Sequence, residues 1–194
     1  FRTNIRREQS CSIKSLTRDY LYKQLLSSGE YTFDHMLVIK DPYGEAPLTA
    51  LALFILEEPA CVRVTTKGNL KETDFVTELP KKKEHRVPIL GMYAEKANDI
   101  VIEILDDEGN CVKSHTFTIR TKRLPKSLRN VITVKKWTDK PAYSNIMING
   151  GVKIHTCVFD IEGEIRYYLS RKPRGYGIFP LSDGHFFYME KYIS

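Results

Sequence analysis

Residues 99–121 read DIVIEILDDEGNCVKSHTFTIRT, and this stretch decides the fold class. Isoleucines at 100, 102 and 104 alternate with other side chains, which is the period-2 pattern of a β-strand. Residues 107–110, DEGN, are typical of a tight turn because glycine and asparagine tolerate a positive φ. β-formers then return up to residue 121. A strand, a turn and a second strand predict an antiparallel hairpin.

Strand-sized segments flank this hairpin on both sides and are separated by turn residues. Strands are predicted at 35–40, 47–56, 59–66, 75–79 and 86–90 before the hairpin, and at 131–135, 146–148, 152–159, 164–169 and 184–188 after it. Only residues 15–28 carry apolar side chains at helical spacing, and Gly29 suits the end of that helix. Short strands without intervening helices favour a sandwich over a parallel α/β sheet.

Two aromatic-rich segments, 159–168 and 181–187, share the form strand, acidic turn, strand. Propeller blades are built from such antiparallel meanders, so these segments predict the start of a β-propeller. The chain stops directly after the last of these strands, where a lone blade would have an unpaired edge. We therefore expect the natural protein to continue.

The predicted fold class is all-β, an immunoglobulin-like antiparallel β-sandwich followed by the first blade of a β-propeller, with one N-terminal helix. A change of composition at 121–128, where cations and leucines flank Pro125, places a domain boundary there. The predicted units are an N-terminal helical segment (1–30), a β-sandwich accessory domain (31–122), a linker with the first propeller strands (123–150) and a partial β-propeller (151–194).

Composition excludes several classes of protein. Hydrophobic residues make up 42% of the 194 residues, so we expect a folded globular protein, and no apolar run reaches the 18 residues that a transmembrane helix needs. The net charge of +6 is spread over short clusters, which are interpreted as solvated loops, and no stripe of cations interleaved with aromatics supports nucleic-acid binding. The clusters are 6–7, 81–83, 120–126 and 171–174.

The cysteines do not form a recognisable site. Cys11, Cys61, Cys111 and Cys157 lie far apart without a CxxC pair, so a zinc ribbon or a redox motif has no support. Cys61 and Cys111 both fall in predicted strands. Buried free thiols and a disulfide both stay open.

Three segments carry a resemblance to a known family. They are YGEAPLTAL at 43–51, VPILGMY at 87–93 and FTIRT at 117–121. Together they resemble the amino-terminal domain of bacterial aryl-sulfate sulfotransferases, with Met92 at a position where leucine is more usual. The resemblance extends over residues 15–194.

The resemblance implies an activity as well as a fold. Members of this family move a sulfuryl group from a phenolic sulfate ester to another phenol through a transiently sulfated histidine, without PAPS, in a six-bladed propeller. It therefore implies a phenolic sulfate donor and a phenol acceptor, no cofactor and no metal, and it is compatible with a homodimer. By the resemblance the location is periplasmic or extracytoplasmic, and a cytoplasmic location stays open. The family's essential histidines and arginine lie in later blades, so none is assigned here, and we expect this chain alone to be inactive.

Few residues of the chain itself are candidates for a site. Arg174 and Tyr176 lie in a segment expected to face a propeller channel, where a guanidinium and an aromatic ring suit an aryl sulfate; a basic surface loop is the alternative. The five histidines are each interpreted as isolated and hydrogen-bonded or partly exposed. They are His35, His85, His115, His155 and His185. The competing function is a noncatalytic immunoglobulin-like binding or assembly module of an extracytoplasmic protein.

Overall fold

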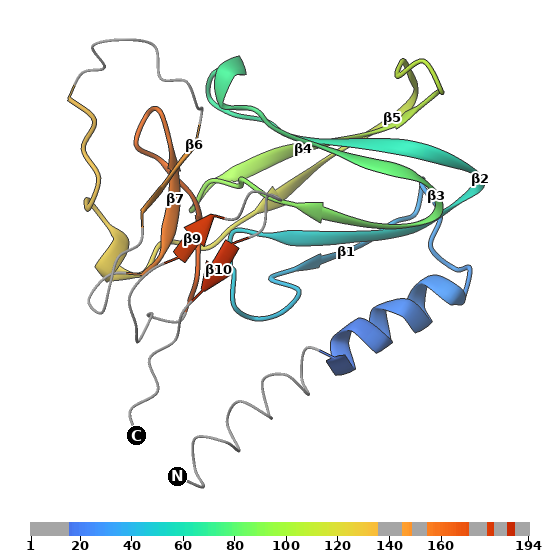
Figure 1. Ribbon diagram of the computed structural model, residues 1–194, viewed down its shortest axis with the longest axis horizontal. Helices are drawn as coiled ribbons and strands as arrows, with labels where there is room; N and C mark the ends of the chain where they lie inside the picture. Colours follow the sequence, from blue (N-terminus) through green and yellow to red (C-terminus); the bar gives the residue numbers. More distant parts are fainter. Residues whose placement is uncertain (1–15, 136–144, 149–154, 171–177, 181–185, 189–194) are drawn as a thin grey trace, which may run out of the picture.

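The computed structural model describes residues 16–135, 145–148, 155–170, 178–180 and 186–188 (Figure 1). These residues are mostly β, arranged in antiparallel sheets, with one helix at residues 16–27. This confirms the predicted all-β class and the single N-terminal helix.

Five strands make the largest sheet, and the long strand β2 is its centre. They are β1 (Leu37–Lys40), β2 (Ala50–Thr66), β3 (Phe75–Ile89), β4 (Ala97–Leu105) and β5 (Cys111–Arg120). The first half of β2 pairs with β1 and its second half pairs with β4, whereas β3 follows β2 along both halves. β2 therefore belongs to two groups of strands, with β1 and β3 along its first half and with β3 and β4 along its second half.

A bend between the two halves of β2 turns this sheet into a sandwich. The register of β2 against β3 shifts between Ile55 and Ala60, and Pro59 within the shift has no N–H to donate. Figure 1 shows β2 and β3 curving together at one end of the molecule. Phe54 before the bend and Val62 after it are both fully buried in the same apolar cluster, so the two halves enclose one core.

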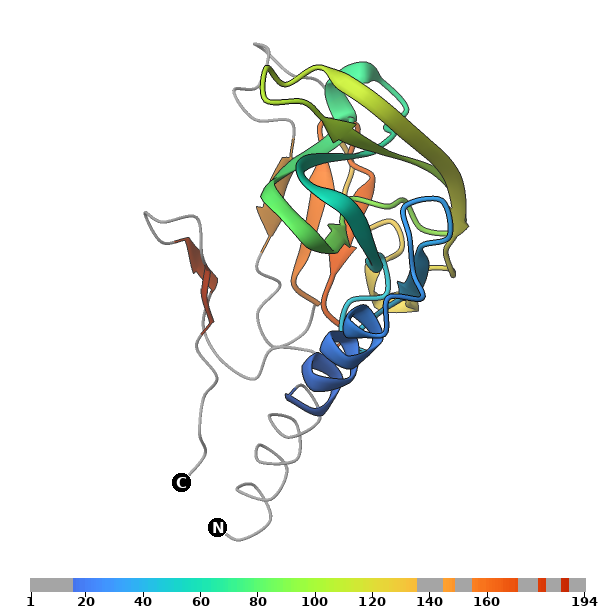
Figure 2. The same ribbon diagram turned by 90° about the vertical axis from the view of Figure 1, so that its right-hand side faces the viewer.

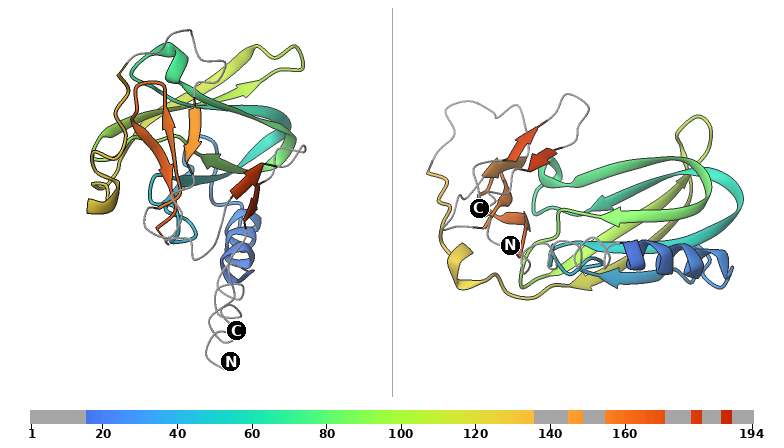
Figure 3. Two further views of the ribbon diagram at one scale, coloured as in Figure 1. Left: turned by 60° about the vertical axis from the view of Figure 1, so that its left-hand side comes forward. Right: turned by 60° about the horizontal axis from the view of Figure 1, so that its bottom comes forward.

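The helix covers the outer face of the first half of β2. Tyr22 and Leu26 pack against Leu51 and Leu53, whose side chains point away from the main core because neighbours in a strand alternate. Figure 3 shows the helix alongside the strands of the sandwich. The helix ends before Gly29, which has a φ of +72°.

A smaller antiparallel sheet lies at the end of the sandwich opposite the bend (Figure 1), and it lies behind the larger sheet in the view of Figure 2. Its strands are β6 (Asn145–Ile148), β7 (Cys157–Asp160) and β8 (Ile165–Tyr168), in the order β6-β7-β8. A third unit is the antiparallel pair β9 (Ile178–Pro180) and β10 (Phe186–Tyr188). These meanders are compatible with propeller strands, and the blade itself and the domain boundaries stay predictions.

The hairpin predicted from residues 99–121 is confirmed. β4 and β5 pair antiparallel, with Ile100 opposite Phe117 and Ile102 opposite His115. Asp106 closes the turn, because its Oδ1 accepts hydrogen bonds from the backbone N–H groups of Glu108 and Asn110 at 3.0 and 2.8 Å.

Other predicted elements were wrong in detail. The lysine run 81–83 lies inside β3 rather than in a loop between two strands. Among the described strands, β3 pairs only with β2, and an edge strand tolerates exposed lysines. Residues 131–135 form no strand, despite their β-formers. The predicted strands at 47–56 and 59–66 are one bent strand, and β9 was not predicted.

Candidate functional site

Arg166 on β8 is, with Asp160, one of the two most enclosed charged groups among the described residues. Its side chain is 1% exposed, although arginine is almost never fully buried without partners. Nε donates to the carbonyl oxygen of Gly91 at 2.7 Å, and Nη1 lies 2.8 Å from the carbonyl oxygen of Thr73. Nη1 also lies 3.0 Å from both the Tyr93 hydroxyl and Asp160 Oδ2. The guanidinium thus joins β8 to two loops of the sandwich.

Asp160 neutralises Arg166 and also builds the β7–β8 turn. Its Oδ1 accepts hydrogen bonds from the backbone N–H groups of Glu162 and Glu164 at 3.0 and 3.1 Å, and its Oδ2 contacts Arg166. The carboxylate is completely buried, so either charge alone would be costly to desolvate. The two ions therefore stabilise each other only as a pair.

The VPILGMY segment forms the socket that receives Arg166. Gly91 has a φ of +74°, and a Cβ built there would lie 2.7 Å from the Cβ of Phe75, so the site favours glycine. The guanidinium carbon of Arg166 lies 3.9 Å from the centre of the Tyr93 ring. Burial raises the pKa of the Tyr93 phenol, whose hydroxyl donates to Asp160 Oδ2 at 3.1 Å.

The YGEAPLTAL segment holds two other parts of the chain. The Tyr43 hydroxyl donates to Asp19 Oδ1 on the helix at 2.8 Å. The carbonyl oxygen of Glu45 accepts a hydrogen bond from the backbone N–H of Ser170, just after β8, at 2.8 Å. Both segments therefore contact elements that are distant in sequence.

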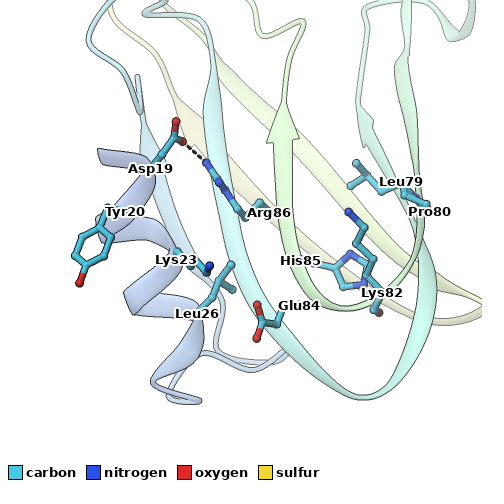
Figure 4. A pocket seen from close by; sticks show the side chains of 10 residues that line it. All are labelled: Asp19, Tyr20, Lys23, Leu26, Leu79, Pro80, Lys82, Glu84, His85 and Arg86. Atoms are coloured by element: carbon cyan, nitrogen blue, oxygen red, sulfur yellow. Dashed lines mark hydrogen bonds and ion pairs between the residues drawn. The ribbon is translucent and has the colours of Figure 1, made fainter. Parts of the chain in front are cut away.

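A hollow of about 560 Å³ lies between the helix and β3 (Figure 4). Asp19 and Arg86 form an ion pair across it at 2.5 Å, and the hydrogen bond from Arg86 lowers the pKa of the Asp19 carboxyl. Lys23, Lys82 and Glu84 also line it, so charges of both signs surround the hollow. Its three cationic and two anionic side chains leave an excess of only one positive charge, which is little to select a charged ligand.

His85 lies at the base of this hollow and is buried. Its ring stacks on Phe54 with centroids 5.3 Å apart, and Nε2 lies 2.8 Å from the carbonyl oxygen of Lys82. Burial lowers the pKa of the imidazole. With a main-chain partner on Nε2, His85 is a structural histidine of the bend rather than a free nucleophile.

The substrate contacts predicted from the sequence fall on residues that the structure does not describe. Arg174, Tyr176 and His185 lie outside the described residues. His115 packs between the rings of Phe33 and Phe117, and His155 Nδ1 lies 2.8 Å from the carbonyl oxygen of Leu169. Each of these two histidines is thus in a structural setting.

Metal and disulfide sites are also absent from the part of the chain that the structure describes. It contains no group of three or more His, Cys, Asp or Glu side chains that could hold a metal ion. Cys61, Cys111 and Cys157 are free, and Cys11 lies outside the description. No described helix is long and apolar enough to cross a membrane.

Arg166 and Asp160 were missed by sequence reasoning. The turn at 160–163 was visible as an acidic, glycine-containing reversal, and it is confirmed by the pairing of β7 with β8. The partners of Arg166 in the sandwich lie 73 to 93 residues away in sequence, so no local sequence pattern predicts these contacts.

The matched family agrees with the sandwich. The family model described as the arylsulfotransferase Ig-like domain matches residues 37–122, from the start of β1 to just beyond β5. Residues 37–122, here called the Ig-like domain, are therefore similar to the domain of that family. No curated protein matches the chain. The Ig-like domain contains the socket for Arg166, whereas Arg166, Asp160, Ser170 and the helix lie outside it.

Proposed function

We propose that this chain is the amino-terminal part of an aryl-sulfate sulfotransferase, in which the Ig-like domain supports a catalytic β-propeller. One observation carries the proposal: the matched Ig-like domain is joined by buried polar contacts to an antiparallel meander of the kind that builds propeller blades. The chain then contributes assembly rather than catalysis.

The proposed reaction moves a sulfuryl group in two steps. A histidine nitrogen of a later blade attacks the sulfur of a phenolic sulfate ester, the S–O bond to the aryl oxygen breaks, and the phenolate leaves and takes up a proton. The oxygen of an acceptor phenol then attacks the sulfated histidine, loses its proton and releases the imidazole. No PAPS or other cofactor enters, and cationic groups stabilise the charge on the sulfuryl oxygens.

Within the chain, Arg174 and Tyr176 are the proposed substrate contacts. A guanidinium at position 174 can donate two hydrogen bonds to sulfuryl oxygens, and a tyrosine ring at 176 can stack on the aryl group. Both assignments come from the sequence and from the family's propeller channel.

The test is a transfer assay with the full-length native protein. It should release 4-nitrophenol from 4-nitrophenyl sulfate at a rate that depends on added phenol, whereas residues 1–194 alone should release none. Arg174→Ala should raise KM for the sulfate ester several-fold, and the nearby Arg171→Ala is the matched control. A full-length protein that is inert with several phenols would instead favour an assembly or binding module of an extracytoplasmic protein.

A further inference from the structure

The Ig-like domain does not close its hydrophobic core with its own residues. Phe54 and Ile102 of the domain share one buried apolar cluster with residues beyond position 122. Those outside contributors are Leu128, Cys157, Phe159, Ile165 and Tyr168, all at most 8% exposed. Removing residues 123–170 would therefore uncover apolar surface of the domain.

Polar contacts attach the β7–β8 hairpin to the Ig-like domain at three places. Arg166 is bound in the middle of the hairpin by the carbonyl oxygens of Thr73 and Gly91. At the turn, Asn69 Nδ2 donates to Glu162 Oε2 at 3.2 Å, and at the open end Ser170 donates its backbone N–H to the carbonyl oxygen of Glu45 at 2.8 Å. Every acceptor or donor on the domain side lies within residues 37–122.

The buried ion pair makes partial detachment costly. If the hairpin shifted while the core stayed closed, Arg166 would lose its three acceptors on the domain side, and Asp160, which moves with Arg166, would lose the Tyr93 hydroxyl. One nitrogen, Nη2, already has no partner among the described residues, so the guanidinium has no spare contact with which to compensate. Buried donors left unpaired are expensive, which favours an all-or-none attachment.

We propose that residues 155–170 and the Ig-like domain unfold and refold as one cooperative unit, and that the buried contacts of Arg166 couple the two. The domain then acts as a template that fixes the position of the strands that follow it. This inference concerns folding, so it stands or fails independently of the proposed sulfuryl transfer.

Hydrogen exchange on the unmodified 194-residue chain tests the inference first. At low denaturant concentrations, the slowest amides of β7 and β8 should exchange at the same opening free energy as those of β2 and β4, with the same denaturant dependence. If β7 and β8 open at least 100-fold more often than β2 and β4, the single-unit proposal is overturned.

The variant Arg166→Met should then separate the two regions. It removes every guanidinium contact and leaves Asp160 unpaired, so the amides of β7 and β8 should exchange about 100-fold faster relative to those of β2 and β4. Arg63→Met is the matched control, because Arg63 pairs with Glu78 on an exposed sheet face and should change both regions equally. Equal changes for the two variants would refute the role of Arg166.

A milder variant covers the case in which Arg166→Met does not fold. Tyr93→Phe deletes one hydroxyl that contacts Arg166 and Asp160, while the ring stays in place. It should raise the exchange of β7 and β8 about 10-fold relative to β2 and β4. If the amide exchange of β7 and β8 relative to β2 and β4 does not change in this variant, the proposed coupling through Arg166 and Tyr93 is overturned.

Discussion

Two segments outside the Ig-like domain are attached to it, the helix at 16–27 and the β7–β8 hairpin, and they are attached differently. The helix buries Tyr22 and Leu26, but its ion pair Asp19–Arg86 has side chains that are 43% and 38% exposed. The corresponding values for Asp160–Arg166 are 0% and 1%. Water can replace the Asp19–Arg86 ion pair but cannot reach the Asp160–Arg166 pair, although the helix also has one buried hydrogen bond, from the Tyr22 hydroxyl to the carbonyl oxygen of Pro42 at 2.5 Å. The helix should therefore detach locally more readily than the hairpin.

The largest loss of stability is expected when Asp160 is removed, because this uncouples the hairpin from the Ig-like domain. Asp160→Ala leaves the Arg166 guanidinium buried without its counter-ion and should lower the free energy of unfolding by about 3–5 kcal/mol in urea titrations. Glu164→Ala, at the end of the same turn and exposed, is the control and should cost under about 1 kcal/mol. Equal losses would mean that the buried ion pair does not contribute to stability.

Gly91→Ala probes the socket from the side of the domain. It combines a positive φ with a Cβ that would lie 2.7 Å from Phe75, so we expect a loss of about 3 kcal/mol by thermal or chemical unfolding. Gly109 also has a positive φ, +84°, but open space around it, so Gly109→Ala should lose only about 1–2 kcal/mol. The difference between the two variants isolates the close contact with Phe75.

Leu26→Ala tests whether the helix detaches alone. Truncating a buried leucine costs about 2 kcal/mol or more. Because the helix packs on the outside of the sandwich and its ion pair with Arg86 is exposed, the loss should appear as faster amide exchange of residues 16–27, with little change in β2 or β4. A uniform loss of protection across the sandwich would show that the helix belongs to the cooperative unit.

His85, next to the bend of β2, should make the free energy of unfolding depend on pH. Burial lowers the pKa of His85 below the reference 6.5, so below that pH the unfolded chain binds more protons than the folded chain. Stability from this group is complete above about pH 6.5 and falls as the pH drops towards the lowered pKa, with a slope of at most about 1.4 kcal/mol per pH unit. His85→Gln should remove this slope from urea titrations between pH 5 and 7.5; an unchanged slope would assign it elsewhere.

The smallest expected effect is on the exposed ion pair of the helix. Asp19→Asn should lower stability by about 0.2–1 kcal/mol, and added salt should shrink the difference, since surface charges are screened. The measurement is unfolding at low and high ionic strength. A larger, salt-independent loss would place Asp19 in a buried network like that of Asp160.

Sequence reasoning worked where partners are close along the chain. The β4–β5 hairpin was predicted because its turn, 106–110, and its alternating strands are adjacent in sequence. The same applies to the turn at Asp160, whose carboxylate caps residues two and four positions later. The lysine run failed as a loop prediction because its charges reflect exposure, which an edge strand also provides.

The sequence by itself determined the β class, the single helix, the positions of the tight turns and the resemblance that residues 37–122 bear out, because alternation, capping and turn chemistry are local. Only the tertiary structure decided that β2 serves both layers of the sandwich. It also decided that Arg166 enters a socket made by Thr73, Gly91 and Tyr93. Both features depend on burial and on contacts between residues 73 to 93 positions apart in sequence. Hydrogen bonds and ion pairs between such residues become strong only once folding has excluded water, and no local sequence pattern predicts them.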